Sequence, residues 1–319
     1  MSFKNIRGQE RTITILKNYI AQSRLRGGYL FSGPEGIGKQ LVALNLAKTL
    51  NCQEDGIDSC DQCASCQKID KNQHPDVHVI ACADSQIQIE YIRQLQSHIS
   101  LKPYEGRVKV FIINDAHTLT AEASNALLKI LEEPPENSLI ILITDKLNLL
   151  FKTIISRCKI LKFSPLMRSE VEEIISRDYG VDKESAHFLA YFSEGSLGCA
   201  LRLKDMDILR EKNRVIDAFG HSLKKTYENL NIQSKPEIRR DLNILASWFR
   251  DIYLVKIGLP HQELINFDRR QDLLKIMSSF AFTDLNDIMD TISVSLKYLE
   301  QNINTRLLLN NLGARLWKD

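Results

Sequence analysis

Residues 33–40 read GPEGIGKQ and nearly match the phosphate-binding loop GxxxxGK followed by Ser or Thr. A strand-like segment precedes them and a helix-like segment follows, as this motif requires. In such a loop backbone N–H groups point at phosphate oxygens, and the lysine, here Lys39, neutralises the outer phosphates. Gln40 stands where the motif has a hydroxyl, and an amide is a poor substitute in the oxygen shell of Mg²⁺. The candidate nucleotide-binding residues of the loop are Gly33, Gly36, Gly38 and Lys39.

The loop therefore favours nucleotide binding without efficient hydrolysis. The alternative is a glycine-rich turn that joins a strand to a helix and binds no ligand. Lys39 argues against this alternative, because a cation at the positive end of a helix dipole is unfavourable unless an anion lies beside it.

The run RVKVFIINDAH, residues 107–117, predicts a buried parallel strand that ends in polar residues. Nucleotide-hydrolysing α/β domains hold Mg²⁺ through a carboxylate at this point, and a second group orients the attacking water. These two positions hold Asn114 and Asp115 or Asp115 and Ala116, depending on the register in which the strand is aligned with this pattern. The first register replaces the metal carboxylate by an amide, and the second replaces the base by a methyl group, which accepts no proton. Both registers lose one half of the pair.

Cys52, Cys60, Cys63 and Cys66 form a Cx7CxxCxxC cluster in a polar segment. Two overlapping CxxC pairs suit tetrahedral thiolate ligation of Zn²⁺, and four thiolates leave no open position on the ion. The cluster therefore predicts a structural zinc site. The alternatives are free surface thiols, which are unfavourable in such number on one loop, and a redox role.

Bulk composition excludes several classes of protein. A hydrophobic content of 44% is ample for a packed core, and 319 residues correspond to about two or three domains. The net charge of +2 is too small for the whole surface to attract nucleic acid. The N-terminus lacks an apolar leader, and no run of about 18 apolar residues is present, so we expect no membrane segment and a cytoplasmic location.

Helix-like and strand-like segments alternate from residue 9 to about residue 165. Short apolar runs near residues 29, 77, 108, 139 and 159 predict five strands, with helices between most of them. This α/β pattern indicates a doubly wound parallel sheet. Pro165 and the Ser-initiated helix start that follows it mark a boundary, beyond which only helical periodicity continues.

Several motifs together resemble the clamp-loader subunits of bacterial DNA polymerase III, which are part of the AAA+ superfamily. The motifs are IRGQE near the N-terminus, GPEGIGK, the four-cysteine insert, HPD at 74–76, SNALLKILEEPPENSLIILIT at 124–144, and IISRC. The resemblance spans residues 5 to about 200. It implies an AAA+ domain over residues 1–165 with a zinc module at 52–66, a small helical lid at 166–205, and an all-helical collar for oligomerisation at 206–319.

The resemblance also implies roles for single residues. In this family the arginine of Ser-Arg-Cys, here Arg157, acts as an arginine finger on the ATP of a neighbouring subunit. Taken alone, such an arginine is usually a solvated surface charge. Counting back from NALLKILEEPP favours the first register, with Asn114 at the family's metal aspartate and Asp115 at its glutamate. Thr144 matches the sensor threonine, and Gly198 stands where motor subunits carry a second sensor, an arginine.

Gln40, Asn114 and Gly198 each remove a component for hydrolysing the chain's own nucleotide, whereas Arg157, which serves a neighbour, is intact. The resemblance therefore implies a non-hydrolysing stator subunit with structural Zn²⁺, and it leaves ATP binding open. The implied partners are gamma or tau motor subunits, the delta subunit, the sliding clamp and primer-template DNA. The alternatives are an active gamma- or tau-like motor with Asp115 as the base, and a zinc-stabilised AAA+ adaptor outside replication.

Overall fold

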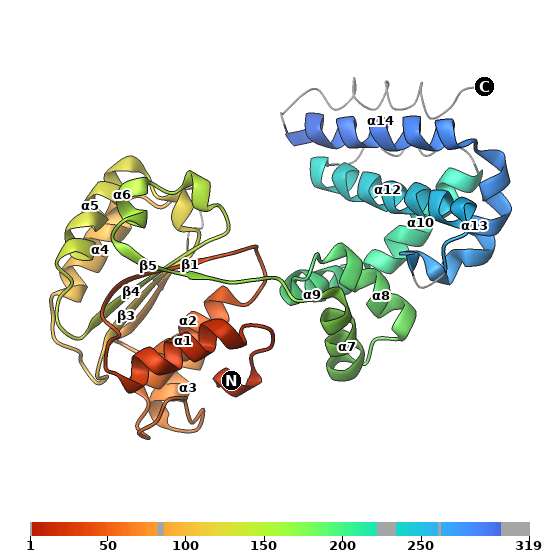
Figure 1. The fold of residues 1–319 in the computed structure, drawn as a ribbon. Helices are drawn as coiled ribbons and strands as arrows, with labels where there is room; N and C mark the ends of the chain where they lie inside the picture. The colour runs from red at the N-terminus through yellow and green to blue at the C-terminus, as the bar shows by residue number, and fades with distance from the viewer. Residues whose placement is uncertain (1, 82–85, 222–233, 261–262, 301–319) are drawn as a thin grey trace. The chain divides into compact units, whose positions relative to one another are not determined.

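The structure of the chain is a computed structural model (Figure 1). It describes residues 2–81, 86–221, 234–260 and 263–300. Parts of the predicted collar therefore lie outside the described residues, namely 222–233, 261–262 and 301–319.

The chain divides into two compact units. The first comprises residues 1–167 and 194–199, and the second comprises residues 168–193 and 200–319. Each unit is described by itself below. The division into three domains with boundaries at residues 165 and 205 stays a prediction.

The first unit is built on a five-stranded parallel sheet with the strand order β2-β3-β4-β1-β5. These strands coincide with the five apolar runs of the sequence, which confirms the predicted α/β fold class. The three central strands β1, β3 and β4 are buried almost throughout, because helices cover both faces of a parallel sheet, whereas the edge strands β2 and β5 are partly exposed. The strands are β1 (Gly27–Ser32), β2 (Val77–Ile80), β3 (Lys109–Ile113), β4 (Ser138–Thr144) and β5 (Cys158–Lys162).

Helices cover both faces of this sheet (Figure 1). One face packs against α1 and α2 in a core that includes Leu16 and Phe31. The other face packs against α4, α5 and α6 in a core that includes Leu30 and Leu127. Neighbouring residues of β1 thus enter opposite cores, as the alternation of a strand requires. The helices of this unit are α1 (Glu10–Ala21), α2 (Lys39–Asn51), α3 (Ala64–Asp70), α4 (Ile89–Ile99), α5 (Ala121–Glu132) and α6 (Lys152–Ile155).

The N-terminal helix α1 is fixed to the end of the last strand. Gln9 Nε2, next to α1, donates to Ser164 O at 2.8 Å. Thr12 Oγ1 donates to Lys162 O at 3.0 Å, and Lys162 is the last residue of β5. These two hydrogen bonds therefore join the start of the first unit to the end of its last strand.

The two ends of the sheet carry different residues. The strands β1, β3 and β4 end next to the phosphate loop, Asp115 and Thr144, respectively. Because the strands are parallel, these three points lie on the same side of the sheet, which we call the carboxyl end. α2 begins at this end and runs back to the other, where Asn51 Nδ2 donates to Val108 O at 3.0 Å, just before β3. Arg157 directly precedes β5 at this second edge, the amino end.

The second unit is helical throughout its described part. The longest helix among the described residues, α12, begins with a capping box in which Ser234 N donates to Glu237 Oε2 at 2.7 Å, and it ends at Gly258 with a φ of 88°. No helix in the described residues is long and apolar enough to cross a membrane. The helices are α7 (Arg168–Tyr179), α8 (Lys183–Phe192), α9 (Leu197–Asp205, which begins in the first unit), α10 (Ile208–His221), α12 (Lys235–Ile257), α13 (Arg270–Ile276) and α14 (Phe282–Glu300).

Candidate functional site

The phosphate loop joins β1 to α2 at the carboxyl end of the sheet. Gly33 N donates to Thr144 O at 3.2 Å, which ties the loop to the end of β4. Gly36 and Gly38 have φ values of 73° and 94°, in the left-handed region that favours glycine. Gly38 is also the N-cap of α2. This geometry explains the glycines even without a ligand, so nucleotide binding by the loop stays a prediction.

Lys39, the first residue of α2, is 7% exposed. Its Nζ donates to Gly33 O at 2.6 Å and also to Pro34 O. Burial lowers the pKa of Lys39, and nearby carboxylates, first among them that of Asp145, oppose the shift. The ammonium is thus held by carbonyl oxygens of the loop and lies within the field of acidic residues.

Potential metal ligands converge beside this loop in Asp115, His117 and Asp145, whose ligand atoms all lie within 4.8 Å of one another. His117 Nδ1 lies 3.2 Å from Thr144 Oγ1 and 3.4 Å from Asp145 Oδ1. The structure therefore connects the predicted Asp115 and Thr144 through two residues that the sequence reasoning missed. A search for polar residues just after each predicted strand would have found both His117 and Asp145.

The segment of residues 194–199 lies against the phosphate loop within the first unit. Gly198 N donates to Gly36 O at 3.0 Å, and Ser196 Oγ donates to Glu35 O at 2.8 Å. A Cβ atom on Gly198 would lie 2.7 Å from Gly36 O, closer than real Cβ atoms come to backbone. Position 198, where an arginine is expected in motor subunits, therefore has no room for a side chain. Sequence reasoning also missed Ser196, because its hydrogen bond to Glu35 O forms only when these distant segments of the chain approach each other in the fold.

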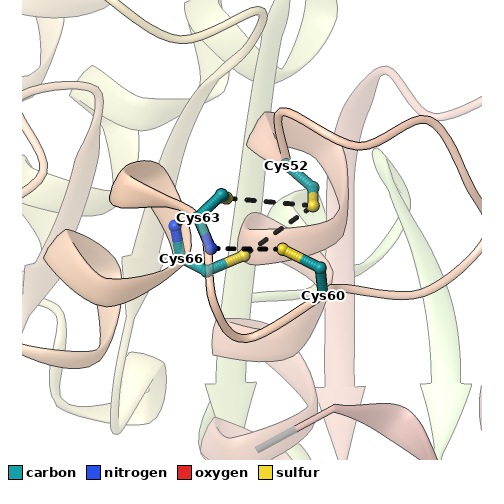
Figure 2. Close-up of side chains that lie close together, drawn as sticks. All are labelled: Cys52, Cys60, Cys63 and Cys66. Carbon is teal, nitrogen blue, oxygen red and sulfur yellow. Dashed lines mark hydrogen bonds between the residues drawn. The ribbon is translucent and has the colours of Figure 1, made fainter.

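Four cysteine side chains converge between the end of α2 and the start of α3 (Figure 2). Cys52 directly follows α2, and Cys63 is the N-cap of α3. Cys52 Sγ lies 4.0 Å from Cys63 Sγ and 3.8 Å from Cys66 Sγ. The ligand atoms of all four residues, Cys60 included, lie within 4.8 Å of one another. The structure thus brings together all four predicted metal ligands.

These distances fit one metal ion. Tetrahedral Zn²⁺ with bonds of about 2.3 Å to sulfur places the sulfur atoms about 3.8 Å apart. Cys63 N donates to Cys60 Sγ at 3.3 Å and Cys66 N donates to Cys63 Sγ at 3.5 Å, contacts that favour thiolates. Burial raises the pKa of the Cys52 and Cys66 thiols, so these groups need a cation to be held as thiolates. The four residues can therefore hold zinc, which would crosslink the loop to α2 and α3.

A buried lysine ties the cysteine loop to α2. Lys48 has a side chain that is 1% exposed, and its Nζ contacts Asp61 in the cysteine loop. The same Nζ donates to both carboxylate oxygens of Asp70, the last residue of α3, at 3.0 and 2.9 Å. A buried ammonium is costly unless it is paired, so these contacts fix both segments against α2.

Arg157 lies between α6 and β5, and its side chain is 34% exposed. It pairs with Glu132, the last residue of α5, with Arg157 Nε donating to Glu132 Oε1 at 2.7 Å. Arg157 Nη1 donates to Thr153 O at 3.1 Å. Sequence reasoning did not single out Glu132, because the pair joins two elements across 25 residues and no periodicity links them.

Arg157 is too far from the phosphate loop of its own chain to contact it. β5 and β1 run parallel, and Gly28 lies opposite Cys158, the residue after Arg157. From Gly28 to Gly33 the chain advances about 17 Å, at about 3.3 Å per residue, which exceeds the reach of a side chain. A phosphate that Arg157 contacts must therefore be bound elsewhere.

Comparison with known families adds independent information. The family described as DNA polymerase III, delta subunit, matches residues 8–167, and the one described as DNA polymerase III, delta subunit, C terminal, matches residues 210–316. DNA polymerase III subunit delta' of Bacillus subtilis (strain 168) is 30% identical over 322 residues, which cover 97% of this chain and 96% of that protein. DNA polymerase III subunit tau of Escherichia coli (strain K12) is 37% identical over 214 residues, which cover 65% of this chain but 33% of tau.

A solved structure agrees in fold. A DNA polymerase III gamma-subunit-related protein of Thermotoga maritima aligns with a TM-score of 0.50 and 19% identity, covering 96% of this chain and 98% of that one. At that identity the likeness concerns the fold alone. The match to subunit delta' extends over nearly the whole of both sequences.

Proposed function

The chain belongs to the DNA polymerase III delta-subunit family, and from this premise we propose that it is a delta-prime subunit, the stator of a clamp loader. In this role it does not hydrolyse ATP itself. It helps to load the sliding clamp onto primed DNA and offers Arg157 to the ATP of a neighbouring motor subunit. The carrying observation is that an exposed Arg157 lies at the amino end of the sheet, away from its own phosphate loop.

The geometry of Arg157 supports an action on a neighbour. A finger must present its guanidinium at the protein surface, and this side chain is 34% exposed. Its planar fork can bind phosphate oxygens bidentately and thereby stabilise the charge that develops during phosphoryl transfer. Because Arg157 is about 17 Å from its own loop along the strand direction, the phosphate would be held by another subunit.

The carboxyl end of the sheet supports the absence of hydrolysis by this chain. Gln40 offers no hydroxyl to Mg²⁺, and Asn114 replaces the metal carboxylate in the register that the resemblance favours. At position 198 the backbone contact with Gly36 leaves no room for an arginine. Lys39 and the loop N–H groups still suit an anion, so we propose that the loop binds ATP weakly or serves only as structure.

We extend the proposal to cofactor, partners and location. Zn²⁺ bound by the four cysteines would be structural, because four thiolates complete its coordination. The partners would be the gamma or tau and delta subunits, the sliding clamp and primer-template DNA, with the helices after residue 205 acting as the collar. A cytoplasmic location accords with this role in replication.

The second candidate is an active gamma- or tau-like motor with Asp115 as the base. The 37% identity to tau over 65% of this chain favours it. The cluster of Asp115, His117 and Asp145 also offers ligands for a divalent cation beside Lys39. The replacements at Gln40, Asn114 and Gly198 argue against it.

ATP turnover by the purified chain with Mg²⁺, compared with its Lys39→Ala variant, separates the two candidates. The stator predicts no turnover in either protein. Turnover that disappears with Lys39 would make the chain a motor and overturn the proposal.

The proposed action of Arg157 on a neighbouring subunit is tested in the assembled loader. Replacing Arg157 by Ala is expected to lower ATP turnover at the adjoining motor site by about 10³-fold or more. Arg157→Lys is the matched control for charge, and it should restore little activity because an ammonium lacks the fork. Unchanged turnover with Arg157→Ala would exclude the finger.

A further inference from the structure

We propose that Glu132 is the positioning residue of Arg157, an inference that rests on the proposed function and names the group that orients the finger. Glu132 ends α5, and its carboxylate receives one edge of the guanidinium. Arg157 Nε donates to Glu132 Oε1 at 2.7 Å, and Nη2 contacts the same oxygen. One carboxylate oxygen thus fixes the edge of the guanidinium that carries Nε and Nη2.

The opposite side of the guanidinium is held more loosely. Arg157 Nη1 donates to Thr153 O at 3.1 Å and to Ser156 Oγ at 3.3 Å. Ser156 Oγ has an acceptor of its own, since it donates to Thr153 O at 3.0 Å. An arginine carries five N–H groups, and the contacts among the described residues leave one Nη2 N–H without a partner. A phosphate oxygen can therefore take this N–H and displace Ser156 from Nη1 while Glu132 keeps its hold.

The segments that carry the two residues are packed against each other through β1. A Cβ atom on Gly28 would lie 2.6 Å from Leu131 Cδ2 and 3.1 Å from Cys158 Sγ. Leu131 and Cys158 directly precede and follow Glu132 and Arg157 in the chain, respectively. The glycine in β1 thus lets the end of α5 and the start of β5 approach, which sets the distance between the carboxylate and the guanidinium.

Exposure argues that this ion pair serves orientation more than stability. The side chain of Glu132 is 50% exposed and that of Arg157 is 34% exposed. Ion pairs at such positions contribute little to folding, because water screens them. They do restrict a long side chain to one rotamer, and a guanidinium held in advance loses less conformational freedom when it binds phosphate.

Glu133 provides a matched control. It follows Glu132 in the chain, is exposed, carries the same charge, and forms no ion pair in the described part of the structure. Glu133→Ala therefore changes the charge of the surface by the same amount as Glu132→Ala but leaves the guanidinium held.

The test measures ATP turnover by the assembled loader, reconstituted with its motor subunits, as a double-mutant cycle. Glu132→Ala is expected to lower kcat about tenfold, with the ATP concentration at half-maximal rate unchanged, since the finger acts on the transition state. Glu132→Gln, which keeps an acceptor oxygen, should lose less. Combined with Arg157→Ala, Glu132→Ala should have no additional effect, and Glu133→Ala should behave as the unaltered protein.

Other outcomes overturn the inference in distinguishable ways. An equal loss from Glu132→Ala with and without Arg157 would mean that the carboxylate acts through the fold. A rise in turnover would mean that it withholds the finger, and an unchanged rate would mean that it does neither. If Arg157→Ala itself has no effect, the proposed function and this inference both fail, because there is then no finger for Glu132 to position.

Discussion

The carboxyl and amino ends of the same five strands are held in different ways. At the carboxyl end, backbone carbonyl oxygens are the acceptors: Gly198 N donates to Gly36 O, and the Lys39 ammonium donates to carbonyl oxygens of its own loop. At the amino end, side chains are the acceptors. Fully buried Asp76 accepts N–H bonds from Tyr104, Glu105 and Gly106 at 2.7, 2.9 and 2.8 Å, and four thiol groups converge after α2.

The contrast shows that the backbone shape of a site and its chemically active side chains are separate features. Gly36 and Gly38 are needed for the turn itself, so the outline of a phosphate loop is retained although Gln40 lacks the hydroxyl of the motif. At the amino end, the contacts depend on the charge of particular side chains, and the exposed Arg157 lies there. The expected effects of mutation therefore differ between the two ends, and four experiments test the difference.

Removing one of the proposed zinc ligands should have the largest effect. Replacing Cys63 by Ser deletes one of the four candidate ligands, and structural zinc sites contribute about 10 kcal/mol or more in small domains. We expect loss of bound zinc and a fall in the melting temperature of about 10 °C or more. Metal analysis and thermal unfolding, with and without a chelator, measure both. Cys199→Ser, outside the cluster, should keep the metal, and wild-type protein free of zinc would contradict the prediction.

Replacing Asp76 by Asn should have the next largest effect, a loss of about 3 kcal/mol in the free energy of unfolding, because a neutral amide cannot accept all three N–H bonds. Although burial raises it, the N–H donors Tyr104, Gly106 and Glu105 hold the pKa of Asp76 below its ordinary value. A lowered pKa stabilises above the unfolded value, and this contribution disappears as pH falls through the folded pKa.

The difference between wild type and Asp76→Asn should therefore be full at neutral pH and shrink below about pH 4. Urea unfolding at several pH values measures it. Asp55→Asn is the control, since that side chain is 88% exposed, and it should change little. A difference that stays constant down to pH 2 would show that the charge of Asp76 is unimportant.

At the carboxyl end, Gly198→Ala should destabilise the chain by about 1 to 3 kcal/mol, because its Cβ must displace the phosphate loop. The added atom would lie 2.7 Å from Gly36 O. Gly56→Ala is the control, since the nearest atom to its Cβ would be 3.7 Å away. Denaturant unfolding compares the two, and equal midpoints would mean that residues 194–199 do not hold the loop in solution.

The smallest effect is expected from restoring the missing magnesium groups. Gln40→Thr combined with Asn114→Asp supplies a hydroxyl and a carboxylate, yet position 198 still lacks an arginine. We expect ATP turnover by this variant alone to stay below detection. Turnover at a motor-like rate would show that two side chains separate the two kinds of subunit and that the backbone contact is unimportant.

Features contiguous in the chain could be predicted from the sequence. Buried parallel strands are short apolar runs, and the cysteine spacing predicts that the four side chains converge, so the sheet and the cysteine cluster were both predicted. Contacts between distant segments could not be found this way. The pairs Arg157 with Glu132 and Gly198 with Gly36 arise only when packed elements approach, and neither has a periodic signal in the chain.

The closure of the first unit by Gln9 and Ser164 has a consequence during synthesis. The two residues are 155 positions apart, and their bond forms beside the pairing of β1 with β5. At about 5 to 20 residues per second, these 155 positions take about 8 to 31 s to synthesise, so α1 leaves the ribosome that long before its partner. For that interval one edge of β1 lacks β5, and the core that α1 shares with Leu161 and Phe163 is incomplete, so we expect the nascent chain to be more prone to aggregation before residue 164 emerges.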